Sequence, residues 1–266
     1  PARPAHIRWN PRFASRRSRR SAAGDALTYS LDPQSKHKFG LIVLSTDETL
    51  ENEARHVLEA RDVALYHSRI FSANTVTRAS LRDMETRLSE AAGLLPEGVD
   101  VIGYGCTSAS VMIGAEGVEK RIQAAKPGVA VTNPMSAICA ALNHVGAAKI
   151  AMLTPYTHAV ADPMRAYLQR CGVEIVTTFD FGEEDDRRVA RISETSTQEA
   201  VGRLLSNTDV DAIFASCTNL RSFGIIESIE TDTGVPMLSS NQALLWHMLR
   251  LSGIQAKGWG PGRLFR

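Results

Sequence analysis

Short apolar runs alternate with amphipathic stretches along the chain from residue 39 onward, a pattern that predicts α/β units built around parallel sheet. Eight of these runs have the length and composition of buried strands. They fall into two successive groups of four: residues 39–45, 63–68, 100–106 and 129–134, followed by residues 148–155, 174–179, 211–217 and 235–240.

The stretches between these runs show the 3.6-residue apolar spacing of helices. Thr77 or Ser80 is suited to begin one of them, and Gly172 is suited to end another. The clearest helical patterns cover residues 47–60, 77–95, 161–172 and 195–206.

Equivalent positions in the two groups are separated by a nearly constant 106–111 residues. The matching pairs are Ile42 with Ile150, Cys106 with Cys217, and Val129 with Val235. This spacing is far too long for a solenoid repeat and indicates an internal duplication. The sequence therefore predicts two pseudo-symmetric α/β domains of the Rossmann or flavodoxin-like kind, each with a four-stranded parallel sheet.

The expected boundaries follow from this doublet. Residues 39–147 form the first domain and residues 148–254 the second. Residues 1–38 are expected to be an Arg-rich, partly disordered tail, and residues 255–266 a second tail.

One short motif occurs at the same place in both halves: "YGCTSAS" contains Cys106, and "ASCTNLR" contains Cys217. Each cysteine ends the third predicted strand of its half. Ligands of parallel α/β sheets bind outside the carboxyl ends of the strands. If the two halves face each other, the two thiols flank one cleft, and the active site is expected there.

Such thiols can carry out acid, base or nucleophilic chemistry without a cofactor. A thiol between a strand and a helix start lies near backbone N–H groups that lower its pKa. Thr107 and Ser108, and then Thr218 and Asn219, add donors suited to a carboxylate. Two thiols on opposite sides of the carbon next to that carboxylate can remove a proton from one face and return one to the other.

Charge and composition exclude several classes of function. The 266-residue chain has a formal charge of +1, but seven arginines lie within residues 1–24, which leaves 23 basic and 29 acidic residues in the remainder. The body is mildly acidic and unsuited to nucleic acid. The Arg-rich head also has some character of a transit peptide or a nucleic-acid arm. No apolar run is long enough for a membrane span or a secretory signal.

Cysteine usage points to a reducing compartment, so we expect a cytoplasmic location. The four cysteines contain no Cys-x-x-Cys pair, and no Cys/His cluster suggests a metal. Cys139 and Cys171 fall at positions typical of packing. We expect neither a metal nor a cofactor.

At the two cysteine motifs the chain resembles the Asp/Glu racemase superfamily, in the branch of maleate isomerases and arylmalonate decarboxylases. It is closest to the racemase-like proteins of ectoine-utilisation clusters, and the resemblance covers residues 39 to about 254. It implies that Cys106 and Cys217 form an acid/base pair and that Tyr156 of "LTPYT" touches a substrate carboxylate. It also implies that helix 241–251 packs back on the first domain and that the protein is a homodimer.

The chain differs from that branch in the charge of two stretches. Asp47 stands where maleate isomerases present an asparagine, and "FDFGEEDDRR" has acids where that branch has a substrate-contacting asparagine. Asp47 is suited to an ammonium or hydroxyl group of the substrate, and equally to capping the helix that follows it. Arg69 is a candidate carboxylate clamp, and equally a partner in a structural ion pair.

Together these features predict a cofactor-independent racemase or isomerase. It would transfer a proton next to the carboxylate of a small amino, hydroxy or dicarboxylic acid, with a role in ectoine catabolism implied by the resemblance. Two alternatives stay open: cis–trans isomerisation through a covalent cysteine adduct, and a non-catalytic small-molecule binding module. Decarboxylation is disfavoured because the resembling decarboxylases have one active-site cysteine. The expected substrate contacts are Asp47, Arg69, Thr107, Ser108, Tyr156, Thr218 and Asn219.

Overall fold

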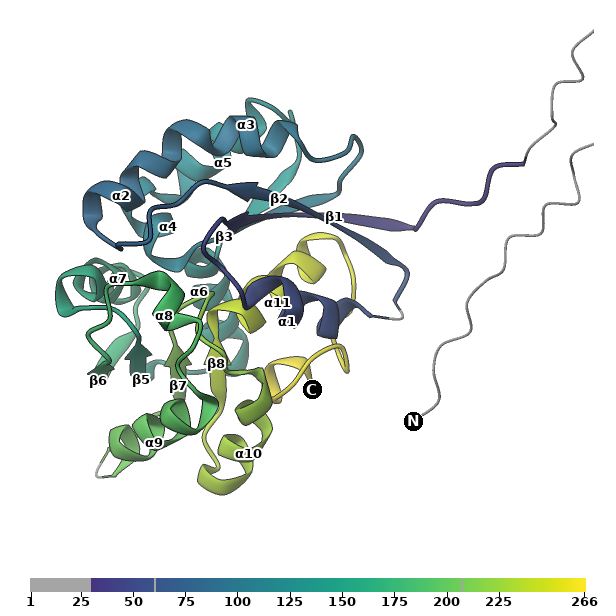
Figure 1. Cartoon of the computed structure of the whole chain (residues 1–266). Helices are drawn as coiled ribbons and strands as arrows, with labels where there is room; N and C mark the ends of the chain where they lie inside the picture. The colour runs from purple at the N-terminus through teal and green to yellow at the C-terminus, as the bar shows by residue number, and fades with distance from the viewer. Residues whose placement is uncertain (1–29, 60, 207) are drawn as a thin grey trace, which may run out of the picture. The chain divides into compact units, whose positions relative to one another are not determined.

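The computed structural model describes residues 30–59, 61–206 and 208–266 (Figure 1). The chain divides into a unit of residues 1–34 and a unit of residues 35–266, and all helices and strands described below belong to the second unit. The Arg-rich stretch of residues 1–24, expected to be a partly disordered tail, lies outside the described residues.

The first sheet has four parallel strands in the order β2-β1-β3-β4. Its central strand β1 is fully buried at Phe39, Leu41 and Ile42, as its unbroken apolar run predicts. The strands are β1 (His37–Leu44), β2 (Val63–Ile70), β3 (Val101–Gly105) and β4 (Ala130–Thr132).

The second sheet repeats this arrangement in the order β6-β5-β7-β8, again all parallel. Its strands are β5 (Lys149–Thr154), β6 (Glu174–Asp180), β7 (Ala212–Ala215) and β8 (Met237–Ser239). In both halves the first strand pairs with the second and the third, and the third pairs with the fourth. The predicted fold class, two α/β halves with four-stranded parallel sheets, is confirmed.

Helices connect the strands of the first half. Thr77 begins α2 with a capping box to Ser80, as expected. The helix expected over residues 77–95 is divided into α2, a 3-10 turn and α3. The helices are α1 (Leu50–Leu58), α2 (Arg78–Asp83), η1 (Met84–Arg87), α3 (Leu88–Gly93), α4 (Thr107–Ile113), α5 (Ala115–Gln123) and α6 (Pro134–Val145).

The second half is built in the same way. Its helices are α7 (His158–Arg170), α8 (Asp186–Val189), α9 (Glu194–Leu205), α10 (Phe223–Thr233), α11 (Ser240–Leu251) and η2 (Arg263–Phe265). Residues 255–266, expected as a tail, end in packed structure: Leu264 and Phe265 are buried, and Gly258 N–H donates to the Phe265 carbonyl. Two large apolar side chains account for this difference, because burying them removes apolar surface from water.

Helix α11 lies between the two sheets, with α1 close to it (Figure 1). It begins with a capping box between Ser239 and Gln242. It packs against α6, α1 and β3 of the first half as well as against β8, the strand that precedes it. This helix therefore joins the halves whose strand ends carry the two cysteines.

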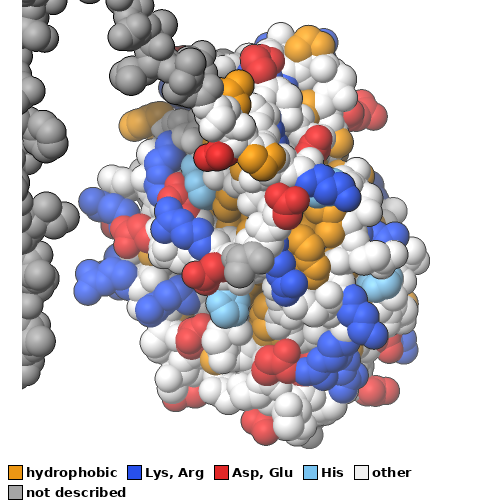
Figure 2. All heavy atoms as spheres, turned by 90° about the vertical axis from the view of Figure 1, so that its right-hand side faces the viewer, with side chains coloured by type: hydrophobic (Ala, Val, Ile, Leu, Met, Phe, Trp, Pro, Cys, Tyr) orange, Lys and Arg blue, Asp and Glu red, His pale blue; other side chains and the backbone are white. Residues whose placement is uncertain are grey.

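The described helices are each too short or too polar to span a membrane. On the face shown in Figure 2, acidic and basic side chains are interspersed around small apolar areas.

A glycine at the end of β3 makes room for helix α1 beneath the first cysteine loop. A Cβ on Gly105 would lie 2.3 Å from Leu50 Cδ2 and 3.2 Å from the Ile42 carbonyl oxygen. We expect Gly105→Ala to lower the free energy of unfolding by about 1–3 kcal/mol, because backbone and a buried leucine must shift.

Chemical denaturation checks this expectation, with Gly202→Ala as the control. Gly202 lies inside α9, and a Cβ there meets no described atom within 4 Å. This control should stabilise the protein by up to about 1 kcal/mol. Equal effects of the two substitutions would contradict the packing argument.

Candidate active site

Cys106 directly follows β3 and is the N-cap residue of α4. Its side chain is buried, and the backbone N–H of Ala109 donates to its Sγ at 3.4 Å. Ser108 Oγ lies 3.8 Å from the same sulfur. The thiol is thus fixed at the carboxyl end of the first sheet, beside the free N–H groups of a helix start.

Cys217 occupies the equivalent place after β7 and is also buried. The backbone N–H of Asn219 donates to its Sγ at 3.3 Å. The Tyr156 hydroxyl, from the loop after β5, lies 3.1 Å from the same sulfur. The Tyr156 side chain therefore contacts the Cys217 thiol directly. It also lines the site, as the resemblance implies.

Asp186, the first residue of α8, links this tyrosine to the rest of the site. The Tyr156 hydroxyl donates to Asp186 Oδ1 at 3.1 Å. Thr46 Oγ1 and Asn219 Nδ2 donate to Oδ2 at 2.6 and 3.2 Å. The sequence analysis identified the acidic stretch that contains Asp186 but did not select this residue, because nothing in a run of four acids shows which one turns inward.

Asp47 lies in the loop between β1 and α1. Its Oδ1 accepts the backbone N–H groups of Thr49 and Leu50 at 2.9 and 2.8 Å. The carboxyl group therefore closes the turn that precedes α1, as the capping interpretation expects. Oδ2 is buried and has no hydrogen-bond partner among the described residues.

A small cavity lies between the two halves, beside Cys106 and Asp186. Its volume is about 10 Å³, roughly the space that one water needs. Any larger substrate therefore requires the loops to open. The polar residues in its wall are Thr46, Ser72, Ser80, Cys106, Ser108, Tyr156 and Asp186, and the rest are Leu44, Ala73, Val76, Leu81 and Met84.

Burial dominates the acidity of both thiols. It raises the pKa of Cys106 to about 12, although the N–H of Ala109 and the hydroxyl of Ser108 act in the opposite direction. The pKa of Cys217 is likewise raised, first by burial and then by the charge of Asp186. The expectation of thiols acidified by helix starts is wrong for this closed state, because loss of water outweighs the backbone donors.

The carboxyl groups respond to burial in the same direction. Burial raises the pKa of Asp47 to about 7, and the charge of Asp186 adds to this. The pKa of Asp186 is raised by burial as well, despite its three donors. Among the described residues that line the cavity, none is Lys, Arg or His. The site thus contains acid groups without a cationic partner.

Three predicted contact residues use their side chains elsewhere. Thr107 Oγ1 donates to Ser240 Oγ at 2.9 Å, which ties α4 to α11. Thr218 Oγ1 donates to the Gly105 carbonyl at 3.3 Å, which ties the two cysteine loops together. In this structure these hydroxyls position the loops and do not line the cavity, and their contact with substrate stays a prediction.

The side chain of Asn219 is also occupied. Its Oδ1 accepts the backbone N–H of Glu48 at 2.9 Å, and its Nδ2 donates to the Asp186 carbonyl at 2.9 Å. This amide therefore connects the Asp47 loop to α8, and only its backbone N–H reaches a cysteine. In this structure the Asn219 amide holds the loops, and its contact with substrate stays a prediction.

Arg69 serves the structural role that the sequence left open. Its Nη1 donates to the carbonyls of Leu44 and Asp47 at 3.1 and 3.0 Å, and its Nη2 pairs with Glu51 at 3.0 Å. It fixes the backbone of the Asp47 loop from outside the cavity wall. A guanidinium engaged in this way is not available as a carboxylate clamp.

The four cysteines are free thiols. Among the described residues, no three His, Cys, Asp or Glu side chains gather in a group that could hold a metal ion.

The structure therefore consists of two similar α/β halves, each with a buried cysteine after its third strand. The family model described as arylmalonate decarboxylase matches residues 39–265. The chain belongs to this family. The predicted resemblance to the maleate isomerase and arylmalonate decarboxylase branch is thereby confirmed.

Individual relatives agree with this assignment. A maleate isomerase from Nocardia farcinica is 29% identical over 244 residues, covering 86% of this chain and 95% of that protein. An arylmalonate decarboxylase from Bordetella bronchiseptica is 27% identical over 186 residues, covering 68% and 78%. A structure of a Nocardia farcinica maleate cis–trans isomerase variant with a covalently bound succinylcysteine intermediate has a TM-score of 0.79 at 24% identity, covering 86% and 98%. The chain is a cysteine-based enzyme of the isomerase type.

Proposed function

We propose that the protein is a cofactor-independent racemase or isomerase that transfers a proton at the carbon next to the carboxylate of a small amino or hydroxy acid. The observation that carries this proposal is a buried cluster of two thiols and two acids where the two halves meet. Cys106 and Asp186 line the cavity, Cys217 contacts Tyr156 in its wall, and Asp47 is buried in the loop that follows Thr46. A role in ectoine catabolism is part of the proposal through the resemblance of the chain. Membership of an enzyme family argues against the binding-module alternative.

The proposed reaction has two proton transfers. One cysteine, as thiolate, removes the proton from the carbon next to the carboxylate, and the electron pair of that bond moves into the carboxylate to give an enediolate. The opposite cysteine, as thiol, donates its proton to the other face of the carbon and becomes the thiolate. The backbone N–H groups of Ala109 and Asn219 donate to the two sulfurs and are suited to the negative charge of whichever cysteine is the thiolate.

Tyr156 supports the second thiol in this scheme. With Asp186 ionised, the tyrosine proton is directed to the carboxylate, and the Cys217 thiol can donate to the tyrosine oxygen. Burial and the charge of Asp186 raise the pKa of the Cys217 thiol, which agrees with a proton donor in the resting state. Which thiol acts first then depends on the handedness of the substrate.

Charge favours a substrate that carries an ammonium or hydroxyl group. A dicarboxylate would bring two further negative charges next to Asp47 and Asp186, with no cationic side chain among the described residues of the cavity wall. An ammonium group instead pairs with an ionised carboxylate. The free Oδ2 of Asp47 offers an acceptor for such a group.

Covalent cis–trans isomerisation is the second candidate. A thiolate would add to one carbon of a double bond, the electron pair would move toward a carboxylate, the resulting single bond would rotate, and the thiolate would leave again. The support for this route is the succinylcysteine intermediate of the structurally similar maleate isomerase variant and the maleate isomerases among the relatives.

Solvent deuterium exchange followed by NMR tests the proposal. Wild-type protein is incubated in D₂O with a panel of small amino, hydroxy and unsaturated dicarboxylic acids. Exchange at the carbon next to the carboxylate supports proton transfer and identifies the substrate class. Conversion of maleate to fumarate, together with a thiol–substrate adduct in mass spectrometry, would instead establish the covalent route.

Asp186 is expected to select the substrate. In Asp186→Asn, we expect kcat/KM for the amino acid to fall about 10- to 100-fold, the value of a charge-assisted hydrogen bond. Turnover of unsaturated dicarboxylates should fall less or increase. The control is Asp185→Asn, because the neighbouring Asp185 pairs with Arg187 at the surface. Equal losses for both substrate classes would contradict a role in selection.

A further inference from the structure

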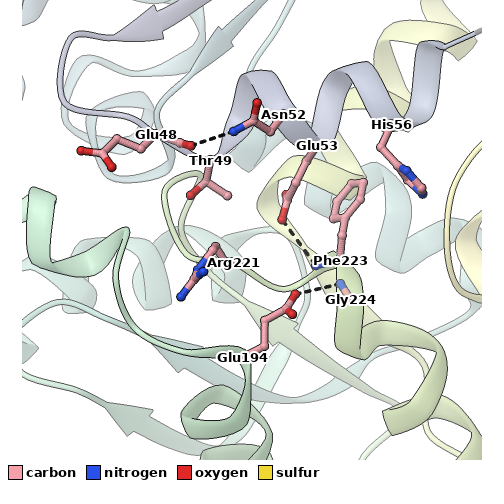
Figure 3. A pocket seen from close by; sticks show the side chains of 9 residues that line it. All are labelled: Glu48, Thr49, Asn52, Glu53, His56, Glu194, Arg221, Phe223 and Gly224. Carbon is pink, nitrogen blue, oxygen red and sulfur yellow. Dashed lines mark hydrogen bonds between the residues drawn. The ribbon is translucent and has the colours of Figure 1, made fainter. Parts of the chain in front are cut away.

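Glu53 is a buried acid that the proposed reaction does not use. It lies in the first turn of α1, and its side chain reaches from the first half of the protein into the second. It forms part of the wall of a pocket of about 390 Å³ that contains neither active-site cysteine (Figure 3).

One carboxylate oxygen of Glu53 holds the end of the Cys217 loop. Oε1 accepts the backbone N–H groups of Ser222 and Phe223 at 3.3 and 3.4 Å, where α10 begins. Ser222 is the N-cap residue, but its own hydroxyl makes no hydrogen bond to this helix or to any other described residue. A carboxyl group from the opposite half therefore replaces the usual local cap.

The other oxygen holds the beginning of the same loop. Asn241 Nδ2, at the start of α11, donates to Glu53 Oε2 and to the Thr218 carbonyl, both at 2.7 Å. The ionised Glu53 carboxylate and the Thr218 carbonyl are both acceptors. The amide nitrogen must therefore face them, and this fixes the orientation of the Asn241 side chain. Thr218 directly follows Cys217, and its hydroxyl continues the connection to the Gly105 carbonyl before Cys106.

We infer that Glu53 is a positioning residue that holds the Cys217 loop at both ends and sets this thiol against the first half of the active site. The inference rests on the proposed role of Cys217 in catalysis. Glu53 touches neither the cavity nor either sulfur, so its effect on the reaction is carried by Asn241 and by the start of α10.

A second acid at the same helix start provides a matched control. Glu194 Oε1 accepts the backbone N–H of Gly224 at 2.9 Å (Figure 3). It caps α10 from α9, within the same half, and no hydrogen bond links it to Asn241 or Thr218 among the described contacts. Glu194→Gln therefore replaces an acid at this helix start alone, whereas Glu53→Gln replaces an acid that also connects the helix start to the Cys217 loop.

Glu53→Gln is expected to keep the α10 cap and to break the other connection. The glutamine oxygen can still accept from Ser222 and Phe223, but its NH₂ group then faces the NH₂ group of Asn241, two donors without an acceptor. Asn241 must turn away, and the Thr218 carbonyl loses its partner. Asn241→Ala removes the same connection without changing Glu53 and serves as a second variant should Glu53→Gln not fold.

The test measures alkylation of individual thiols by iodoacetamide, using peptide mass spectrometry at pH 9 and a temperature at which all variants are folded. This pH lies above the value of about 8 to which burial raises the pKa of Glu53, so the wild-type carboxyl group is ionised. We expect Cys217 to react at least tenfold faster in Glu53→Gln and in Asn241→Ala than in wild type. Cys106 should change less than threefold, and Glu194→Gln should change neither thiol more than threefold. A Cys217 rate in both test variants equal to that in Glu194→Gln would overturn the inference.

Kinetics separate positioning from simple destabilisation. With the substrate identified by deuterium exchange, kcat should fall at least tenfold in Glu53→Gln while KM changes less than threefold. A loss confined to KM would overturn a positioning role in proton transfer. The alkylation result needs no substrate, so it holds or fails independently of the proposed function.

Discussion

Replacing either Cys106 or Cys217 by serine is expected to slow proton exchange at the carbon next to the carboxylate by about 10²–10⁴-fold, the usual contribution of a positioned acid or base. Both single variants should be equally impaired in racemisation, because each turnover needs one thiol on each face of the carbon. Serine preserves the size of the side chain, but its hydroxyl is too weakly acidic to give up a proton near neutral pH. NMR of exchange in D₂O measures each variant directly.

Exchange without inversion would distinguish the two thiols. A variant with one thiol left could still remove a proton from one enantiomer without delivering a proton to the opposite face of the carbon. Deuterium exchange would then continue for that enantiomer, while racemisation would stop. This outcome would assign the remaining thiol to that face.

Cys139→Ser is the matched control. Cys139 lies in α6, is partly buried and packs against the core away from the cavity wall. It should retain activity within about threefold. A loss of racemisation activity of less than tenfold in either Cys106→Ser or Cys217→Ser would contradict the two-cysteine mechanism.

The closed cavity places a condition on this mechanism. Its volume of about 10 Å³ admits no organic acid, and burial holds the pKa of Cys106 near 12. Opening of the loops that carry Asp47, Cys106 and Cys217 would admit both substrate and water. Because loss of water is the largest cause of the raised pKa of each thiol, opening lowers it and makes a thiolate accessible.

Periodicity was sufficient to predict the fold. All eight expected strands occur, because runs such as the one around Ile42 are apolar enough to be buried on both faces of a parallel sheet. The constant offset between Cys106 and Cys217 predicted equivalent places in two sheets of the same order. The order of strands within each sheet was not predicted, since strand spacing along the chain does not determine which strands pair.

Side-chain partners could not be predicted from the same pattern. Arg69 and Thr107 have the right chemistry for a carboxylate, but neighbouring carbonyls, Glu51 and Ser240 occupy them. Their alternative partners are remote in sequence and adjacent only after folding.

One signal of a missed residue was present in the sequence. Glu53 lies three residues after Leu50 and four before Val57, on the apolar side of α1. An acid on a buried helix face requires a polar partner, and the partners here come from α10 and α11. The sequence analysis treated this stretch only as an amphipathic helix.

The buried acids are also expected to make the protein less stable as the pH rises from 6.5 to 8. Burial raises the pKa of Asp47 from 3.8 to about 7 and that of Glu53 from 4.5 to about 8. In this pH range both groups are ionised in the unfolded chain, whereas the folded protein retains part or all of their protons. Folding therefore binds protons, and the free energy of unfolding falls with increasing pH until the folded pKa values are passed. The expected loss is about 2–3 kcal/mol at 1.36 kcal/mol per pH unit and proton.

Urea unfolding at pH 6.5 and 8 measures this slope. Burial lowers the pKa of His67 and His247 from 6.5, which opposes the loss by a smaller amount near the lower end of the window, and unfolded cysteines that begin to ionise near pH 8 add to it. Glu53→Gln should remove most of the pH dependence, because Glu53 stays protonated over most of the window, and adding Asp47→Asn should remove nearly all of it. Asp211→Asn is the control: its carboxylate accepts the N–H groups of Ala148 and Lys149, which lowers its pKa. That substitution should reduce stability equally at both pH values, since Asp211 is ionised in both states throughout. A wild-type stability that is flat or rises between pH 6.5 and 8 would mean that Asp47 and Glu53 are ionised in the folded protein, and Asp47 would then bring a full negative charge to the site.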